Sequence, residues 1–411
     1  MKDKNMAMAY RVAEEVDKAG GRTFFVGGIV RDRLMGVECK DIDIEVHGIP
    51  AKKLIEILDS IGEHTEMGAS FGIYGLRHYE IDIAMPRSEK ANGRGHKDFD
   101  VFTDPFLGEE KAARRRDFTI NAMMENVLTG EIKDFFGGRS DLEKKILRHV
   151  DDASFVEDPL RVLRCAQFAA RFSFSTDDKT VELCRKMDLS SLPKERIMGE
   201  LEKALLKAEQ PSIFFRLLEE MRQNDFWFEE YADLSERERA ETDAFLDNAA
   251  RLRENAKHPL YFMMSALCMY MRNTKSFVEK LSNETDMREY VDNICPLSKN
   301  VRALNTESES DEYWNVLFDK AVCPEDMLLL AYSTEAESVT EKSKEKLAQY
   351  KSLMAKPSVM GRDLIEAGLK PDKNFSEYLN FAHCLHLKGM EKAEALQMTL
   401  EYANKSNHNH P

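Results

Sequence analysis

The sequence predicts an α+β fold, in which a small mixed sheet near the N-terminus precedes a long helical part. Before about residue 140, apolar and polar side chains alternate over short stretches, as half-buried strands require. After that point, helical spacing dominates to Met398 and is interrupted near Pro259, Pro296 and Pro324. At 411 residues, the chain is long enough for two or three domains.

The first elements form a strand, a tight turn and a helix after a leading helix. Residues 4–19 carry apolar side chains at helical spacing and end at two glycines. Residues 23–26 form a β-prone run, which Gly27 and Gly28 break before a helical stretch that ends at Gly36. Because glycine has no side chain, backbone N–H groups at this turn can approach a triphosphate.

The next stretch, residues 41–46, alternates strictly between acidic and apolar side chains. Asp41 and Asp43 therefore point the same way from one strand, where their oxygens can bridge two magnesium ions. This pair suits phosphoryl transfer, although an exposed polar strand gives the same pattern. Glu45 shares the face but lies further along, so a solvated position and a role in the site stay equally open.

A second alternating run at residues 79–83 predicts another strand, and residues 51–61 between the two runs predict a helix. Asp82, on this second strand, is the preferred third carboxylate because it can reach a metal from a neighbouring strand. Arg31 follows the glycine turn and either binds phosphate or forms a salt bridge with Asp32 or another carboxylate.

Residues 157–172 read EDPLRVLRCAQFAARF, in which Asp158 and Arg161 lie three residues apart on one face of a helix. A carboxylate accepts a hydrogen bond from the amino group that C and A share, and an arginine donates to a ring nitrogen or a carbonyl oxygen. The pair can therefore distinguish C and A from G and U. A ladder of surface salt bridges has the same spacing.

The formal charge of −15 argues against nucleic-acid binding over the whole surface. Residues 211–411 hold 25 of the 59 basic and 35 of the 74 acidic residues, so most of the excess lies in the second half. Arginines at 114–116 and between 161 and 171 permit a local positive cleft. Seven scattered cysteines without a CxxC pair, no signal peptide and no long apolar run predict a cytoplasmic protein without a membrane role.

Several segments, taken in order, resemble one family. FFVGGIVRDRLMG, KDIDIEV, RRRDFTINAM, DFFGG and EDPLRVLRCAQFAARF are similar to motifs of the class II CCA-adding tRNA nucleotidyltransferases and bacterial poly(A) polymerases, within the DNA polymerase β superfamily. The resemblance is strong to about residue 210 and weak after it. It implies a polymerase-β-like head over 1–140, a helical neck with a base-recognition helix over 141–208, and a tRNA-binding helical body and tail over 209–411.

The resemblance also implies the roles of individual residues. Asp41 and Asp43 would hold the metal ions, Asp82 would be the third catalytic carboxylate, and Mg²⁺ is the implied cofactor. The arginine and aspartate of RRRDFTINAM would contact the ribose, and the EDPLRVLR segment would read the base. The implied nucleotide-binding residues are Gly27, Gly28, Arg31, Arg116, Asp117, Glu157, Asp158, Arg161 and Arg164.

The implied activity is template-independent addition of C, C and A to the 3′ end of tRNA from CTP and ATP, with release of pyrophosphate. The expected partner is the tRNA acceptor arm, and no obligate protein partner or membrane is expected. Enzymes of the family that add only CC lack most of a loop that this chain retains at residues 88–113, so CC-only addition is disfavoured. The acidic body favours tRNA over poly(A) synthesis, while A-only addition stays open.

Two further alternatives follow from the same segments. A non-catalytic RNA-binding protein with this fold would tend to lose its catalytic aspartates, which are intact here. Some relatives carry a His-Asp metal-dependent phosphohydrolase domain, whose mark is an apolar helix that ends in a His-Asp pair. The apolar stretch at residues 260–271 has no such pair, so we expect no phosphohydrolase activity. Its methionines are expected to fill a core.

Overall fold

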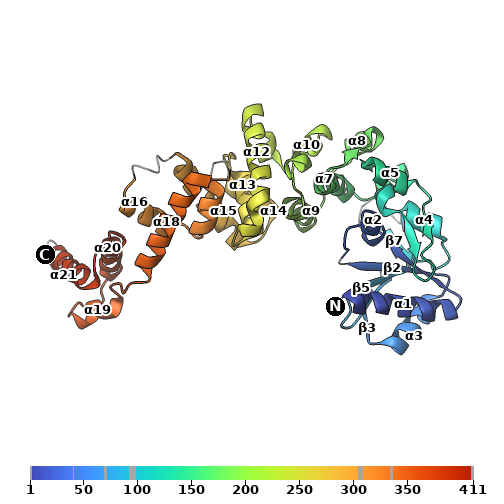
Figure 1. Ribbon diagram of the computed structural model, residues 1–411, viewed down its shortest axis with the longest axis horizontal. Helices are drawn as coiled ribbons and strands as arrows, with labels where there is room; N and C mark the ends of the chain where they lie inside the picture. Colours follow the sequence, from blue (N-terminus) through green and yellow to red (C-terminus); the bar gives the residue numbers. More distant parts are fainter. Residues whose placement is uncertain are drawn as a thin grey trace. The chain divides into compact units, whose positions relative to one another are not determined.

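A computed structural model of the chain describes residues 2–39, 41–68, 72–91, 99–303, 309–333 and 337–408. The chain divides into two compact units. The first consists of Met1–Arg196 and Ile213–Phe226, and the second of Ile197–Ser212 and Trp227–Pro411. The strands of the head lie in the first unit and the second is helical, which confirms the predicted α+β class (Figure 1). The finer boundaries at residues 140 and 208 stay a prediction.

A seven-stranded mixed sheet forms the centre of the first unit, with the order β3-β4-β5-β2-β1-β8-β9. β2 and β5 are parallel neighbours, and the other adjacent pairs are antiparallel. The strands are β1 (Arg22–Val26), β2 (Ile42–His47), β3 (His64–Gly68), β4 (Ile73–Leu76), β5 (Ile81–Ala84), β8 (Met124–Asn126) and β9 (Ile132–Lys133).

Apolar side chains fix this sheet against two helices. Phe25, Ile44 and Ile83 are fully buried on three of its strands and are cross-strand neighbours on one face. The leading helix α1 (Lys2–Lys18) contacts β1, β2 and α3 (Ala51–Ile61). Both helices have the predicted bounds within two residues, because their apolar faces are continuous over several turns.

The predicted loop at residues 88–113 is wrong in part. β6 (Arg87–Ala91) and β7 (Phe99–Thr103) form an antiparallel pair, and α4 (Glu109–Arg114) follows. Residues 92–98 lie outside the described residues. The sequence of β6, RSEKA, lacks apolar alternation, so its pairing with β7 rather than its own pattern makes it a strand.

The segment after the head is mainly helical. Its helices are α5 (Gly138–Lys144), α6 (Asp152–Phe155), α7 (Leu160–Phe172), α8 (Asp178–Cys184) and α10 (Ser212–Glu220). Two short parallel strands, β10 (Ile146–Leu147) and β11 (Ser175–Thr176), precede and follow α7 in the sequence and both contact it. The neck was predicted to be all-helical, so this strand pair is an addition to the prediction. A strand of two residues is too short to show an alternating pattern in the sequence.

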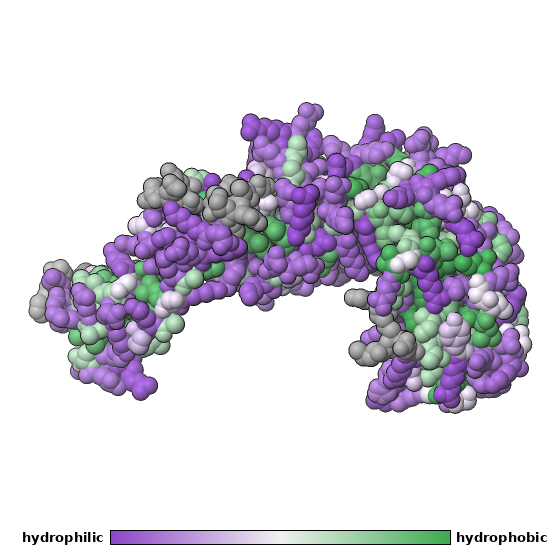
Figure 2. Space-filling view, viewed as in Figure 1, coloured by the Kyte–Doolittle hydropathy of each residue, from purple (hydrophilic) through white to green (hydrophobic). Residues whose placement is uncertain are grey.

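The second unit is built from helices, with mostly hydrophilic side chains on its visible face (Figure 2). They are α9 (Lys194–Lys207), which begins in the first unit, α11 (Glu229–Ala232), α12 (Glu236–Leu252), η3 (Arg253–Asn255), α13 (Pro259–Cys268), α14 (Thr274–Leu281), α15 (Thr285–Ala303), α16 (Asp311–Lys320), α17 (Pro324–Ala331), α18 (Glu337–Met354), α19 (Gly361–Glu366), α20 (Phe375–Leu387) and α21 (Lys392–His408).

Prolines mark the helices of this unit in two ways. Pro259 and Pro324 are the first residues of α13 and α17. A backbone N–H at this position has no acceptor within the helix, so proline costs the helix no hydrogen bond there. Pro296 instead lies inside α15, so the predicted interruption there is wrong. Met263 and Met264 on α13 are fully buried, which confirms their predicted place in a core. Among the described residues, no helix is long and apolar enough to cross a membrane.

Candidate active site

The glycine turn between β1 and α2 (Gly28–Leu34) lies against two predicted site residues. Gly27 has a φ of 71°, in the left-handed region that glycine adopts without strain. A β-carbon at Gly27 would lie 3.2 Å from Arg116 Nη1 and 3.9 Å from Asp43 Oδ2. The turn therefore brings backbone N–H groups next to the carboxylates of β2, and a larger residue there would crowd the arginine.

The predicted catalytic carboxylates meet where β2 and β5 run in parallel. Asp43 lies directly opposite Asp82 in the strand register, and Asp41 is exposed just before β2. Burial raises the pKa of Asp43, and the charges of Asp82 and Asp41 raise it further, while Arg116 opposes this rise. The carboxylates thus repel each other and attract a cation.

The oxygen donors at this position fit a hard divalent cation such as Mg²⁺. Within the described parts of the chain, no ready-made group of three or more His, Cys, Asp or Glu side chains closes around a metal position. The close approach of Asp43 and Asp82 on adjacent strands, with a raised pKa at Asp43, is therefore what supports cation binding.

Arg116 is held by a carboxylate that the sequence left undecided. Glu45 is only 8% exposed, accepts a hydrogen bond from Arg116 Nη2 at 3.2 Å and pairs with His47 Nε2 at 2.8 Å. Burial opposes ionisation of Glu45, but the hydrogen bond from His47 and the charge of Arg116 outweigh it and lower the pKa of Glu45. Of the two interpretations left open, the solvated position is therefore wrong, and a role in the site stays a prediction.

Arg31 is buried beside the glycine turn, where its Nη2 lies 3.5 Å from the position of a β-carbon on Gly28. It is 3% exposed, bonds to Asp32 at 2.6 Å and donates to Asn121 Oδ1 at 2.7 Å. Its guanidinium lies over the rings of Phe168 and Phe172 on α7. Burial lowers its pKa, while Asp32 opposes this effect. The salt bridge to Asp32, one of the two alternatives, is therefore formed, and the predicted triphosphate contact stays a prediction.

Asp117 is the centre of a buried hydrogen-bond network. Its carboxylate accepts from Arg164 at 2.6 Å, from Asn121 Nδ2 at 3.0 Å and from the N–H of Phe118 at 2.8 Å. Burial raises the pKa of Asp117, but the charge of Arg164 and these hydrogen bonds outweigh it and lower the pKa. The continuous chain Arg31, Asn121, Asp117 and Arg164 connects α2 to α7.

The sequence analysis missed Asn121, although a signal was present. Asn121 follows Asp117 by four residues and lies at the end of the short 3-10 turn η2 (Thr119–Asn121), so its amide can return to that carboxylate. Its other partner, Arg31, is 90 residues away in the sequence and could not be identified from spacing.

Asp158 and Arg161 do not share a helix as predicted. Pro159 precedes the first residue of α7, Leu160, so Asp158 lies before the helix and its carboxylate accepts from the Leu160 N–H at 3.1 Å. Arg161 donates to the carbonyl oxygens of Ser154 at 2.6 Å and Arg115 at 2.7 Å. The Arg161 side chain is therefore fixed by backbone acceptors, not by Asp158.

Arg196, on α9, is the ion-pair partner of Asp158. The two side chains approach to 3.0 Å. Glu157 is exposed and forms an ion pair with Arg115 at 3.9 Å. Asp158 and Arg161 are thus held by different partners, Arg196 in the first case and backbone carbonyl oxygens in the second.

Two adjoining cavities contain most of the predicted site. The first, about 360 Å³, is lined by Asp43, Glu45, Asp82, Arg87, Arg115, Arg116 and Arg161, among others. The second, about 310 Å³, is lined by Arg116, Asp117, Asp158, Leu160, Arg161, Arg164 and Arg196. Arg116 and Arg161 belong to both linings, so carboxylates for a cation adjoin a pocket rich in arginine. Such a pocket suits an anionic nucleotide.

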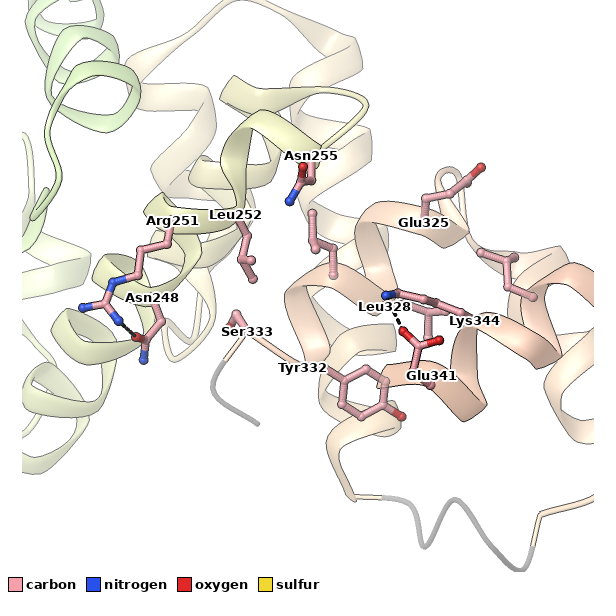
Figure 3. Close-up of a pocket in the computed structure, with 12 residues that line it drawn as sticks. Asn248, Arg251, Leu252, Asn255, Glu325, Leu328, Tyr332, Ser333, Glu341 and Lys344 are labelled. Atoms are coloured by element: carbon pink, nitrogen blue, oxygen red, sulfur yellow. Dashed lines mark hydrogen bonds and ion pairs between the residues drawn. The ribbon is translucent and has the colours of Figure 1, made fainter. Parts of the chain in front are cut away.

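A larger cavity, about 810 Å³, lies within the second unit (Figure 3). Leu252 and Leu328 are among its apolar lining, and Asn248 accepts from Arg251 while Glu341 pairs with Lys344 at its rim. None of the predicted site residues lies in it. Size alone does not make an active site, and the carboxylates and arginines that suit nucleotide chemistry gather in the first unit.

Comparison with known proteins agrees with the motif order. Residues 23–148 match the poly(A) polymerase head domain. The chain is 38% identical over 263 residues to a multifunctional CCA protein of Haemophilus ducreyi, covering 60% of this chain and 62% of that protein. The head of the chain is thus similar in sequence to the poly(A) polymerase head domain and to proteins named for CCA addition.

A second relative is similar over a comparable part of the chain. A CCA-adding enzyme of Marinobacter nauticus is 40% identical over 207 residues, which cover 49% of this chain and 53% of that enzyme. The matches thus span little more than half the length of these relatives, and the shared residues do not extend over the whole of either protein.

Solved structures show the fold over almost the whole chain. A CCA-adding enzyme of Thermotoga maritima in complex with tRNA has a TM-score of 0.70 at 22% identity, covering 97% of this chain and 95% of that one. A CCA-adding enzyme of Bacillus stearothermophilus in complex with CTP has a TM-score of 0.76 at 19% identity, covering 97% of both chains. The predicted head followed by a helical body is confirmed as a fold.

Proposed function

We propose that this protein adds C, C and A to the 3′ end of tRNA, with CTP and ATP as substrates and pyrophosphate as the leaving product. One observation carries the proposal: the carboxylates of β2 and β5 adjoin an arginine-rich pocket through the shared side chains Arg116 and Arg161. A nucleotide that spans the two cavities would place its phosphates near the carboxylates and its base near Asp158. The relatives named for CCA addition support the same activity.

The proposed arrangement assigns each part of the nucleotide to particular side chains. The backbone of Gly27 and Gly28 contacts the triphosphate together with Arg31, whose Nη2 lies 3.5 Å from the position of a β-carbon on Gly28. Arg116 and Asp117 meet the ribose. The base is read by Asp158, Arg161 and Arg164, as the lining of the second cavity permits.

Asp41 and Asp43 are proposed to hold Mg²⁺, with Asp82 as the third carboxylate. When bound, the metal would lower the pKa of the attacking 3′-hydroxyl and neutralise charge on the α-phosphate and pyrophosphate. The aspartates supply oxygen ligands from two adjacent strands, which fixes their separation. Arg116 adds a positive charge beside the glycine turn, where developing negative charge on the phosphates needs it.

The substrate preference follows from hydrogen-bond chemistry. An ionised Asp158 only accepts hydrogen bonds, so it favours the exocyclic amino groups of C and A and repels the carbonyl oxygens of U and G. The acceptor arm of tRNA is the proposed RNA partner, with the helical body over residues 209–411 as its binding surface. A structure in the family was solved with tRNA, and another with CTP.

Removal of divalent cations should stop the reaction reversibly. With CTP and a tRNA that lacks its CCA end, we expect incorporation in Mg²⁺, loss of incorporation to background in excess EDTA, and recovery when Mg²⁺ is restored. Circular dichroism in EDTA should show an unchanged helical spectrum, because the carboxylates are not part of the core. Full activity in EDTA would contradict the metal proposal, and tRNA binding without incorporation in Mg²⁺ would indicate a non-catalytic RNA-binding protein.

A further inference from the structure

Two polar residues of β2 lie beyond the catalytic aspartates and have no role in the function proposed above. Glu45 and His47 are 8% and 2% exposed, and their side chains meet at 2.8 Å. Alternation along the strand puts both on the same face as Asp43. Buried polar pairs are costly unless they are fully bonded, so this pair calls for an explanation beyond packing.

Glu45 also bonds to Arg116, and the three guanidinium nitrogens of Arg116 have different neighbours. Its Nη2 donates to Glu45 Oε2 at 3.2 Å. Its Nη1 lies at the glycine turn, 3.2 Å from the position of a β-carbon on Gly27. Its Nε is buried and, among the residues that the structure describes, has no hydrogen-bond partner. The guanidinium is thus anchored on one side, and the donor at Nε has no protein acceptor.

The two carboxylate oxygens of Glu45 have different hydrogen-bond partners. Oε1 is bonded to His47, whose ring also packs edge-on against Phe24 with the ring centres 5.4 Å apart. Oε2 is thereby turned toward Arg116. His47 therefore fixes the orientation of the carboxylate, and the carboxylate fixes the guanidinium.

Without Glu45, the arginine has another carboxylate close by. Asp43 Oδ2 lies 3.9 Å from the same β-carbon position on Gly27 as Arg116 Nη1. A guanidinium released from Glu45 would therefore shift toward Asp43 and compete with a cation there. Holding Arg116 away from Asp43 keeps both groups available to the nucleotide.

We propose that Glu45, oriented by His47, is a positioning residue that holds the guanidinium of Arg116 at the glycine turn to meet the ribose and phosphates of the incoming nucleotide. The inference rests on the proposed nucleotidyl transfer and adds to it a second layer of residues. It also assigns a role to two side chains that the motif-based assignment left out.

The variant Glu45→Gln tests this role, because it keeps the size of the side chain and removes its charge. Loss of one charge-assisted hydrogen bond corresponds to roughly a tenfold effect, which we expect in the KM for CTP with a smaller change in kcat. The preference for CTP over dCTP should fall as well, because Arg116 would no longer be fixed at the sugar. Glu125→Gln is the matched control, since Glu125 on β8 pairs at 2.8 Å with Arg33 of α2 rather than with Arg116.

Two further comparisons separate positioning from general support of the fold. The cost of Glu45→Gln in CTP affinity, measured by calorimetry, should disappear in an Arg116→Ala background, because the effect acts through that arginine. His47→Gln, which can still donate to Glu45, should retain more CTP affinity than His47→Leu, which cannot.

The outcomes are distinct. Equal KM and equal CTP over dCTP preference in Glu45→Gln and Glu125→Gln would overturn the positioning role, as would an equal cost of Glu45→Gln with and without Arg116. A wild-type protein that binds CTP but transfers no nucleotide would instead refute the proposed function, and the affinity comparison would still decide the role of Glu45.

Discussion

Replacing Asp43 with asparagine should abolish nucleotide incorporation and leave the fold at least as stable. The substitution removes the charge that attracts the cation but keeps the side-chain volume beside Asp82. Loss of a catalytic metal ligand removes several kcal/mol of transition-state stabilisation, so we expect incorporation to fall by roughly a thousandfold or more. Labelled CTP and tRNA without its CCA end provide the assay.

Stability should respond in the opposite direction from activity. The pKa of Asp43 is raised by burial and by Asp82, so the folded state disfavours its ionised form. A raised pKa in a carboxyl group means that its ionisation at neutral pH costs stability, and asparagine removes that cost. The melting temperature should therefore stay equal or rise. Asp59→Asn, at an exposed position on α3, is the control, and normal incorporation by Asp43→Asn would refute the metal assignment.

Replacing Asp158 with asparagine should admit UTP and GTP. A carboxylate only accepts hydrogen bonds, whereas an amide also donates and can therefore face a carbonyl oxygen on the base. The amide oxygen can still accept from the N–H of Leu160, so the start of α7 is preserved. We expect the preference for CTP over UTP to fall by about ten- to a hundredfold, the range of one well-formed contact to a base edge. Competition between labelled CTP and UTP measures this ratio.

The control for this variant is Asp178→Asn, an exposed aspartate in the first turn of α8. It changes the same chemical group in the same part of the chain, away from the second cavity. An unchanged preference for CTP and ATP in Asp158→Asn would count against base selection by protein side chains. A similar loss of preference in both variants would point to a general disturbance of the helices.

Local patterns in the sequence were enough to place most of the head. The alternation at residues 41–46 and 79–83 gave two strands that are indeed neighbours, and the helix at residues 51–61 has the predicted bounds. These predictions succeed because each element buries one face, and the buried face determines the period. β6 was missed because it is polar throughout.

Contacts between distant residues could not be predicted in the same way. Arg31 had two plausible partners in the sequence, and only the packing of α2 against α7 decides for the buried ion pair. Glu45 had no visible partner, because Arg116 lies 71 residues away. Asp158 was expected on a helix, but the proline after it delays the start of α7. Each of these depends on tertiary structure rather than on spacing.

One measurement tests the central claim most directly. The protein would be incubated with three tRNA transcripts, which end before CCA, after the first C and after CC, with CTP and ATP supplied singly and together. The added 3′ ends would then be sequenced. Our account predicts that CTP alone completes CC, that A follows only when ATP is present, and that addition stops at CCA on all three. An open-ended A tail, or addition of A only to the transcript that already ends in CC, would contradict it.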